Sequence, residues 1–363
     1  MVGRGVLKVT SGELRLENVL QTGQAFRWIL EEGIYTTTMR IIPGKYSIIA
    51  LSQDLNTGCI TFDTPNENIG IDTVQNHLRN YFRLEVDLHS IHQNQWLAKD
   101  QKFKMLEHKG IRILGQEPWE TLVSFICSSN NNIGRISKMC HALAQNFGDY
   151  IGKFQERDYY SFPTSNQLAE NATESTLRDL GFGYRAKYII ETAKKFVQAK
   201  QEVGVDNDTD FLQKIAKEKD YLEVREFLMG FCGVGPKVAD CACLMGLKMD
   251  EVVPIDVHVG RIAKRDYSIS ASKKELQAIK SRYDQLPITK KKINLELDFI
   301  RLKFVELWGT HAGWAQGLLF FRETEKNSNS PKKRTKLDET TVISKKLKFE
   351  EEEKLIEVEV KAE

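Results

Sequence analysis

Residues Tyr221 to Leu247 read YLEVREFLMGFCGVGPKVADCACLMGL. Apolar residues recur one helical turn apart in the first half, at Val224, Phe227, Leu228 and Phe231. This spacing predicts a helix with one apolar face. Gly233 and Gly235 favour a tight hairpin, because glycine adopts positive φ readily, and Pro236 suits the first position of a new helix. The second helix, residues 237–247, is apolar almost all round and is expected to be buried, so the segment predicts a helix–hairpin–helix.

Such a hairpin is suited to binding a phosphate. Free backbone N–H groups and the positive end of the second helix both favour an anion at the turn. A contact of this kind holds the backbone of a nucleic acid without reading its bases. The alternative is a plain tight turn between two packed helices.

Lys237 is the most informative side chain of the second helix. A cation in the first turn of a buried helix is repelled by the helix N-terminus and loses hydration. Both effects favour the neutral amine, which is a nucleophile. The alternative is a lysine that contacts a phosphate or extends to solvent. Cys241 follows four residues later and therefore lies on the same helix face.

Asp256 lies in the segment VPIDVHV, residues 253–259, just before a predicted helix over residues 257–264. One interpretation is a helix N-cap. The other is a carboxylate that faces a cleft, where it would stabilise a developing sugar cation or move protons. A cap is rigidly held, so the two roles are compatible. An amine and a carboxylate beside a backbone-binding hairpin indicate attack at C1′ of a deoxyribose, which requires the nucleotide to leave the duplex stack.

Composition and periodicity divide the chain into three segments. Residues 1–95 carry short β-type runs and predict an antiparallel sheet closed by a helix over residues 72–82. Residues 96–325 show a helical apolar period, which predicts an all-helical domain of two lobes with a cleft. The fold class is therefore α+β. Residues 326–363 are too charged to form a core, so a disordered tail is expected. The clearest β-type runs are 25–30, 33–39 and 46–51, and the clearest helical segments are 118–128, 133–147, 174–180, 184–200 and 221–231.

Composition also limits the class of protein. Lys and Arg number 52 against 50 Asp and Glu, a net charge of +2, so any nucleic-acid site must come from local basic patches. No apolar run is long enough for a membrane span, and the N-terminus shows no secretory signal, so no membrane partner is expected. The six cysteines and seven histidines show no CxxC, iron–sulfur or HExxH spacing. We therefore expect reduced thiols, no metal and no cofactor.

Five motifs in a fixed order give the chain a family resemblance. They are residues 22–28 (TGQAFRW), 128–133 (SSNNNI), 181–186 (GFGYRA), 233–241 with 254–258 (GVGPKVADC with PIDVH) and 312–316 (AGWAQ). Together they resemble the helix–hairpin–helix DNA glycosylases with a catalytic lysine, and within them the eukaryotic 8-oxoguanine DNA glycosylase/AP lyases. The resemblance runs from residue 22 to about residue 321. It implies a base excision repair enzyme that removes 8-oxoguanine opposite cytosine and cleaves the strand by β-elimination.

The resemblance also implies residue roles in catalysis and base recognition. Lys237 would be the Schiff-base nucleophile and Asp256 its carboxylate partner. The Gly23 carbonyl would accept the N7–H of 8-oxoguanine, whereas the unprotonated N7 of guanine would leave that carbonyl in a repulsive, unpaired contact. Side chains would bind the flipped base at its Watson–Crick edge and at its two faces: Gln316 at the edge, and Cys241 and Phe320 at the faces.

Contacts to the duplex are implied as well. Polar side chains would bond the cytosine left behind: Asn130, Arg135 and Arg185. Tyr184 would wedge into the gap, His258 would contact a phosphate beside the lesion, and the hairpin at Gly233 and Gly235 would hold the backbone. The expected partner is double-stranded DNA that contains 8-oxoguanine, and the expected state is a monomer. Read alone, Asn130 could mark only a helix boundary.

Three positions depart from the family pattern. They are His311 in place of a tyrosine, Glu323 in place of an aspartate, and Gly260 in place of a bulky residue. Lys187 is a competing lysine, because it also follows a pair of glycines, but it lies four residues past the second glycine on an exposed-looking helix. The sequence therefore favours Lys237 as the nucleophile.

Alternatives from other classes stay open at this point. A helix–hairpin–helix glycosylase for oxidised pyrimidines is disfavoured by the missing iron–sulfur cysteines and by the β-rich N-terminal unit. A non-catalytic DNA-binding module is disfavoured because backbone binding requires neither Lys237 nor Asp256. An unrelated helical scaffold would leave the ordered motifs unexplained. Residues 331–336 (PKKRTK) are typical of a nuclear-import signal, so the nucleus is the expected location, with a mitochondrial share left open.

Overall fold

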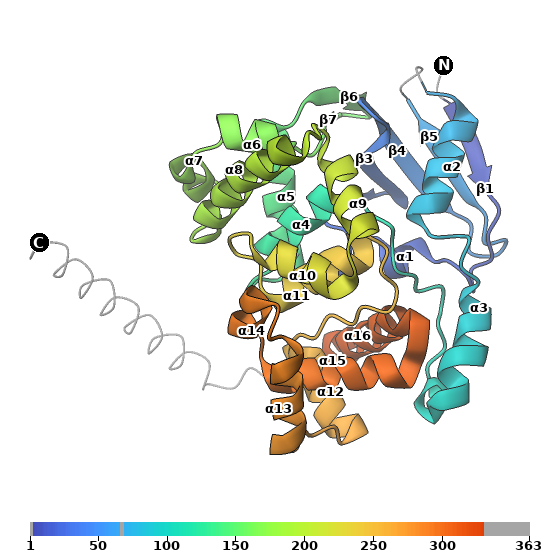
Figure 1. Cartoon of the computed structure of the whole chain (residues 1–363). Coiled ribbons are helices and arrows are strands. Elements are labelled where there is room, and N and C mark those ends of the chain that lie inside the picture. The colour runs from blue at the N-terminus through green and yellow to red at the C-terminus, as the bar shows by residue number, and fades with distance from the viewer. Residues whose placement is uncertain (1–2, 66–68, 330–363) are drawn as a thin grey trace, which may run out of the picture. The chain divides into compact units, whose positions relative to one another are not determined.

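The amino-terminal β-type runs form one five-stranded antiparallel sheet. The computed structural model describes residues 3–65 and 69–329 of the chain. The strands lie in the order β1-β5-β4-β3-β2 (Figure 1). Their bounds are Gly3–Leu7 (β1), Ile29–Glu31 (β2), Ile34–Ile42 (β3), Lys45–Gln53 (β4) and Ile60–Thr64 (β5). Gly33 and Gly44 form the turns on either side of β3, with φ of 80° and 72°. The prediction of antiparallel hairpins is therefore confirmed.

The first strand of this hairpin series is shorter than expected. The run 25–30 predicts a strand, but pairing with β3 begins only at Ile29. The Arg27 side chain bridges the two parts, because it donates to Glu120 of the helical part and to the Thr38 hydroxyl of β3, each at 2.7 Å. The ring of Phe26 packs edge-on against Phe125, with ring centroids 5.6 Å apart. Residues 25–28 therefore connect the sheet with the helices rather than extend the sheet.

One helix covers a face of the sheet. α2 spans Ile71–Tyr81, one residue earlier at each end than the expected helix over 72–82. It buries Val74 and Leu78 in the same apolar core as Ile49 of β4. Figure 1 shows α2 in front of the strands. This core is separate from the larger core of the helical part.

The rest of the described chain is mainly helical, as predicted. Five helices begin and end within three residues of their expected positions: Pro118–Cys127 (α4), Ile133–Phe147 (α5), Glu174–Asp179 (α7), Arg185–Val203 (α8) and Tyr221–Met229 (α10). The other α-helices are Leu16–Val19 (α1), Leu88–Ile91 (α3), Ser165–Asn171 (α6), Asp208–Glu218 (α9), Pro236–Cys241 (α11), Val257–Tyr267 (α12), Lys273–Arg282 (α13), Pro287–Lys292 (α14), Leu295–Trp308 (α15) and Ala312–Asn329 (α16). Short π- and 3-10 turns are His92–Leu97 (η1), Gln101–Met105 (η2), Ala242–Gly246 (η3) and Gly309–His311 (η4).

The last helix, α16, extends into the segment that the sequence assigns to the tail. α16 continues to Asn329, so residues 326–329 are helical although the sequence places the start of the tail at residue 326. The rest of the expected tail, with residues 331–336, lies outside the described residues. Within the described ranges, no helix combines the length and the apolar character that crossing a bilayer requires.

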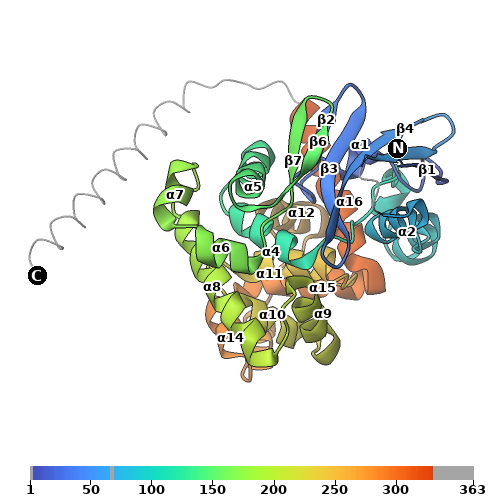
Figure 2. The ribbon, with the colours of Figure 1, turned by 90° about the horizontal axis from the view of Figure 1, so that it is seen from above.

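A small hairpin interrupts the helical part. β6 (Tyr150–Phe154) and β7 (Arg157–Tyr160) form a two-stranded sheet where the sequence predicts helices only. Gln155 makes the turn with a φ of 52°. Tyr159 donates a hydrogen bond to Thr36 of β3 at 2.7 Å. Figure 2 shows the hairpin beside β2 and β3, so it links the helical part to the sheet.

A buried ion network joins α10 and α11 to α15. Arg225 of α10 donates to Asp240 of α11 and to Asp298 of α15, each at 3.2 Å. Arg301 donates to Asp298 at 2.7 Å, and the Tyr283 hydroxyl donates to Asp298 at 2.5 Å. Burial opposes the charge on Asp298, but attraction to the arginines outweighs burial and holds the pKa of Asp298 below its ordinary value. The network fixes the two helices of the hairpin on a third.

Replacing Asp298 by alanine is expected to lower the free energy of unfolding by about 3 kcal/mol, because two buried guanidinium groups lose a carboxylate. Since the folded pKa of Asp298 lies below the unfolded one, its contribution is present at neutral pH and is lost as the pH falls through the folded pKa. Urea unfolding at pH 7 measures the change. Asp284→Ala is the control, because Asp284 pairs with Lys290 at an exposed site and its loss should cost below about 1 kcal/mol. Equal losses would contradict the role of the network.

Candidate active site

The expected helix–hairpin–helix is present, with one change in its second helix. α10 and α11 flank the hairpin, and Pro236 is the first residue of α11. Residues 237–247 predict one continuous helix, but regular α-helix ends at Cys241 and a wider π-turn, η3, follows. Gly233 has a φ of 74°, whereas Gly235 has a φ of −100°. Only the first glycine of the hairpin therefore uses the left-handed region.

Replacing Gly233 by alanine is expected to cost about 2 kcal/mol of folding stability. Positive φ strains an alanine, and its Cβ would lie 2.7 Å from the ring of Tyr188. Gly235→Ala is the matched control, because a Cβ there meets no atom within 4 Å and the φ is ordinary. We expect a loss below about 1 kcal/mol for the control, from its position as the N-cap of α11. Thermal unfolding of both variants measures the difference, and equal losses would refute it.

Lys237 extends from the first turn of α11 toward α4. Its Nζ lies 4.6 Å from the ring centroid of Phe125 and 3.5 Å from Oγ of Ser128. Ser128 donates its own proton to the Phe125 carbonyl at 2.7 Å, which leaves an oxygen lone pair available to the amine. The competing lysine, Lys187, is exposed on α8 and pairs with Glu191 at 3.7 Å. It is not among the residues that line the cavity described below.

Asp256 is the N-cap of α12, one of the two roles expected of it. Its Oδ1 accepts hydrogen bonds from the backbone N–H of His258 at 2.9 Å and of Val259 at 2.8 Å. The same carboxyl group also lines the cavity that contains Lys237, so the cap and the cavity role coexist. The His258 ring packs edge-on against Phe320, with ring centroids 6.3 Å apart.

One cavity brings together residues from widely separated segments. Its lining includes every residue expected in catalysis and base binding: Gly23, Lys237, Cys241, Asp256, Gln316 and Phe320. The lining residues to which the sequence analysis gives no role are Thr22, Gln24, Ile111, Ile113, Phe125, Met245, Pro254, Gly317 and Phe321. A mostly apolar cavity with a few polar groups is typical of a small-molecule binding site.

The loop at Gly23 is held in place by the residue that follows it. Gly23 has a φ of 93°, which favours glycine there. The Gln24 side chain donates to the Arg112 carbonyl at 2.8 Å and accepts from the Leu114 N–H at 3.1 Å. The Gln24 carbonyl accepts from the Gln116 side chain at 2.9 Å. These bonds fix the main chain on one side of the cavity, which is what a preorganised carbonyl acceptor requires.

Cys241 supplies a neutral surface to the cavity. Burial raises the pKa of the Cys241 thiol to about 11, although the nearby Lys237 charge opposes the rise. The thiol is therefore protonated at neutral pH. A buried, polarizable sulfur suits contact with an aromatic ring better than nucleophilic chemistry.

A second polar cluster lies along the loop between α4 and α5. Arg185 donates to the carbonyls of Ser129 and Asn130, the latter at 3.1 Å. Its buried Nε has no hydrogen-bond partner among the described residues. Tyr184 also donates to Ser129, at 3.1 Å, and is 45% exposed. Arg135 donates at 3.0 Å to a carbonyl in the loop that leads to α8. All four residues expected to contact the DNA around the gap therefore gather at this loop.

The segment Ser128–Asn130 connects this cluster to the cavity. Ser128 contacts Lys237 at one end, and the Asn130 carbonyl binds Arg185 at the other. The sequence places residues 128–133 in a motif but gives no sign that Ser128 touches the lysine. That contact depends on the packing of α4 against α11, which no local pattern encodes.

The structure shows what surrounds His311 and Gly260, two of the three positions that depart from the family pattern. The His311 ring is 3.2 Å from the side-chain oxygen of Gln95, and burial lowers the pKa of His311. Gly260 lets α12 approach α15, since a Cβ there would lie 3.4 Å from Leu297. Within the described part of the chain, no group of three or more His, Cys, Asp or Glu side chains is arranged to hold a metal ion.

Two known protein families match the sequence of this chain, and both agree with the geometry of the site. Residues 6–122 match the family described as 8-oxoguanine DNA glycosylase, N-terminal domain. Residues 123–284 match the HhH-GPD superfamily of base excision DNA repair proteins. The fold and the cavity with Lys237 and Asp256 thus define a base excision repair protein of the helix–hairpin–helix class.

Individual relatives show which family within this class the chain belongs to. The N-glycosylase/DNA lyase of Saccharomyces cerevisiae is 54% identical over 329 residues, which cover 90% of this chain and 88% of that protein. The N-glycosylase/DNA lyase OGG1 of Arabidopsis thaliana is 32% identical over 328 residues, 87% of this chain and 79% of that protein. A Clostridium acetobutylicum 8-oxoguanine glycosylase/lyase, solved with DNA that contains cytosine opposite 8-oxoguanine, shares the fold with a TM-score of 0.67 at 27% identity, covering 90% of this chain and 98% of that one. The chain belongs to the 8-oxoguanine DNA glycosylase family of N-glycosylase/DNA lyases.

Proposed function

We propose that this protein excises 8-oxoguanine opposite cytosine from double-stranded DNA and then cleaves the DNA strand at the resulting sugar. The observation that carries the proposal is a single cavity lined by a lysine amine, an aspartate and residues suited to a purine. Lys237 and Asp256 line it together with Gly23, Cys241 and Gln316. A non-catalytic DNA-binding module would need neither of the first two.

The chemistry requires an unprotonated amine at C1′ of the flipped nucleotide. Nζ of Lys237 forms a bond to C1′ as the bond from C1′ to N9 of the base breaks, and the base leaves with the bonding electrons and takes up a proton. The sugar ring then opens to give the iminium form, a Schiff base. Removal of a C2′ proton expels the 3′ phosphate by β-elimination. Asp256 stabilises the cationic sugar and moves protons, and its N-cap bonds hold it in position for both.

Base selectivity is assigned to a main-chain carbonyl. The Gly23 carbonyl accepts N7–H of 8-oxoguanine, whereas guanine presents an acceptor at N7 and leaves both groups unpaired. The Gln316 side chain bonds the Watson–Crick edge, and Cys241 and Phe320 contact the two faces of the base. Support comes from the shared cavity, from the bonds that fix Gln24, and from the neutral thiol of Cys241.

The duplex contacts are assigned to the cluster at the α4–α5 loop and to the hairpin. Asn130, Arg135 and Arg185 bond the unpaired cytosine, and Tyr184 fills the gap. Support comes from the exposed Tyr184 ring and from the bonds that hold Arg185 on the carbonyls of Ser129 and Asn130.

Phosphates of the lesion strand are assigned to two further places. His258 contacts a phosphate beside the lesion, and the hairpin with Gly233 and Gly235 binds another. The open space at the Cβ position of Gly235 supports close approach of a phosphate there.

Borohydride trapping on defined duplexes tests the proposal. Reduction converts the iminium between lysine and sugar to a stable amine, so the protein becomes covalently joined to DNA. We expect an adduct with 8-oxoguanine opposite cytosine and none with guanine opposite cytosine. An adduct on thymine glycol instead would indicate a glycosylase for oxidised pyrimidines. Intact DNA binding without any adduct would indicate a non-catalytic module.

The assembly state and the cellular location complete the proposal. The protein acts as a monomer, since one chain carries every residue assigned to the reaction. It acts in the nucleus, which residues 331–336 support by their basic composition. Light scattering with and without DNA tests the first point. Microscopy of a fluorescent fusion, with and without Lys332, Lys333 and Arg334 replaced by alanine, tests the second and also reveals any mitochondrial share.

A further inference from the structure

A second cavity lies between the sheet and the helical part, behind the cavity that contains Lys237. Its volume is about 760 Å³, within the range of small-molecule sites. It is lined by β3 and the turn after it, by α2, and by the residues that begin α4, α6 and α9. None of the residues assigned above to catalysis, base binding or DNA binding lines it.

A thin wall separates the two cavities. Gln24 lines the first cavity, and the next residue, Ala25, lines the second. Likewise, Met245 lines the first cavity and Gly246 lines the second. Gln116 joins the two parts of the wall, because its side chain donates to the Gln24 carbonyl at 2.9 Å and its N–H donates to the Met245 carbonyl at 2.8 Å. The second cavity is therefore a separate space, and its occupant would lie behind the wall of the first.

Basic side chains gather at one side of the second cavity. Arg40 is half-buried and Lys248 is exposed, and both line the cavity. Neither side chain forms an ion pair or a hydrogen bond with any described residue. Burial lowers the pKa of His77 to about 4, and the charges of Lys248 and Arg40 add to the decrease, which places both cations near that ring. Glu85 and Asp250 attract Lys248, and Glu117 attracts Arg40, but none of these carboxylates forms a close ion pair with either cation.

A strand irregularity accompanies the position of Arg40. The pairing of β3 with β4 shifts register between Arg40 and Ile42, as in a β-bulge. The consecutive residues 37–44 line the cavity, so the strand and the turn after it border the cavity on both sides of this irregularity.

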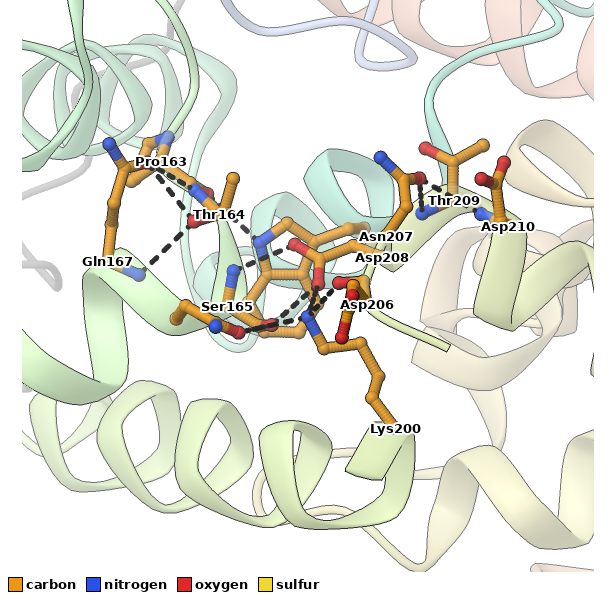
Figure 3. A network of polar contacts seen from close by, with 12 residues as sticks. Pro163, Thr164, Ser165, Gln167, Lys200, Asp206, Asn207, Asp208, Thr209 and Asp210 are labelled. Atoms are coloured by element: carbon orange, nitrogen blue, oxygen red, sulfur yellow. Dashed lines mark hydrogen bonds and ion pairs between the residues drawn. The ribbon is translucent and has the colours of Figure 1, made fainter. Parts of the chain in front are cut away.

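Three of the five carboxylates that line the cavity are already engaged. Glu120 pairs with Arg27 at 2.7 Å. Asp208 accepts from Lys200 and from the Ser165 hydroxyl, each at 2.6 Å, and Figure 3 shows the three groups in contact. Burial raises the pKa of Glu117, which also accepts a hydrogen bond from a threonine of α9. Asp149 and Asp206, the remaining acids of the lining, are exposed. Arg40 and Lys248 therefore remain as lining cations outside these ion pairs.

These features point to a phosphate-bearing ligand. A guanidinium group with free N–H donors matches a phosphate, and a lysine adds a second cation. Tyr46 lines the same cavity, and tyrosine rings stack on bases. The volume exceeds what a bare phosphate needs. We propose that this second cavity binds a small phosphate-bearing molecule of nucleotide size, with its phosphate at Arg40 and Lys248 and its ring at Tyr46.

Isothermal titration of the full chain with AMP tests the proposal, and AMP is chosen because its base is not guanine. Inorganic phosphate and adenosine are titrated separately, since they distinguish an anion site from a nucleoside site. We expect AMP to bind at one site, and we expect inorganic phosphate and adenosine each to bind at least about tenfold more weakly than AMP. The titration is repeated with excess undamaged duplex DNA, which occupies the DNA-binding surface. AMP binding should persist.

Matched variants locate the site. Arg40→Gln and Lys248→Gln should each weaken AMP binding about tenfold, because a charged donor is lost. Arg79→Gln should leave AMP binding unchanged, because Arg79 lies on α2, which borders the cavity, but does not line it. Thermal unfolding checks that each variant is folded.

Four results would overturn the proposal: no AMP binding, displacement of AMP by DNA, binding unaffected by both cavity variants, or phosphate alone binding as tightly as AMP. None of them depends on glycosylase activity, so they are distinguishable from a failure of the function proposed above.

Discussion

Replacing Lys237 by glutamine is expected to lower the rate of strand cleavage at 8-oxoguanine by about 10³-fold or more, and to abolish borohydride trapping. The amide of glutamine cannot form a Schiff base, so the covalent route is lost. Glutamine has a similar length and can still contact Ser128, so the cavity should keep its shape. Single-turnover cleavage of a duplex with one lesion measures the rate, and gel-shift titration measures lesion binding, which should be retained.

Lys187→Gln provides the matched control for this substitution. Lys187 is the other lysine that follows two glycines, and it is exposed on α8 outside the cavity lining. Its replacement should leave cleavage and trapping at the wild-type level. Retained cleavage in the Lys237 variant, or loss of trapping in the Lys187 variant, would show that the nucleophile is wrongly assigned.

Replacing Asp256 by asparagine is expected to lower the excision rate by about 10²- to 10³-fold with little change in stability. Asparagine is as good an N-cap as aspartate, so the bonds to the N–H groups of His258 and Val259 can persist. Only the negative charge is removed from the cavity, and with it the stabilisation of the sugar cation. Single-turnover excision and urea unfolding, measured on the same preparation, separate the two effects.

Two further variants separate the charge of Asp256 from its cap. Asp256→Ala removes both, so it should lose activity and also about 1 kcal/mol of stability. Asp220→Asn changes the N-cap of α10, which lies outside the cavity lining, and should affect neither activity nor stability strongly. If Asp256→Asn kept full activity while Asp256→Ala lost it, Asp256 would act through the cap alone.

The sequence predicts those parts of the site that depend on local pattern. Apolar spacing places α10, and the glycines and Pro236 place the hairpin, because these signals act within a few residues. The gathering of Gly23, Lys237, Asp256 and Gln316 in one cavity follows from the family resemblance. Periodicity alone could not bring together residues almost 300 positions apart.

Other features depend on contacts that the sequence does not reveal. The π-turn after Cys241 replaces the expected continuous helix, although the apolar pattern fits both. The hairpin β6–β7 is too short for its alternation to stand out, and it is held by a bond from Tyr159 to Thr36 of another segment. Arg225 and Asp298 look like ordinary helix-surface charges in the sequence, but the packing of three helices buries both. The second cavity is likewise a product of how the sheet meets the helices.

The segment Ser128–Asn130 has a consequence for fidelity. One end contacts the lysine that would break the bond, and the other end is held by the arginine that would test the opposite base. A residue inserted there would lengthen the segment by about 3.5 Å, more than the length of a hydrogen bond. The lysine and the arginine would then no longer reach the damaged nucleotide and the opposite base at the same time. The length of this short loop would therefore set the separation between the lysine that cleaves the damaged strand and the arginine that contacts the base opposite.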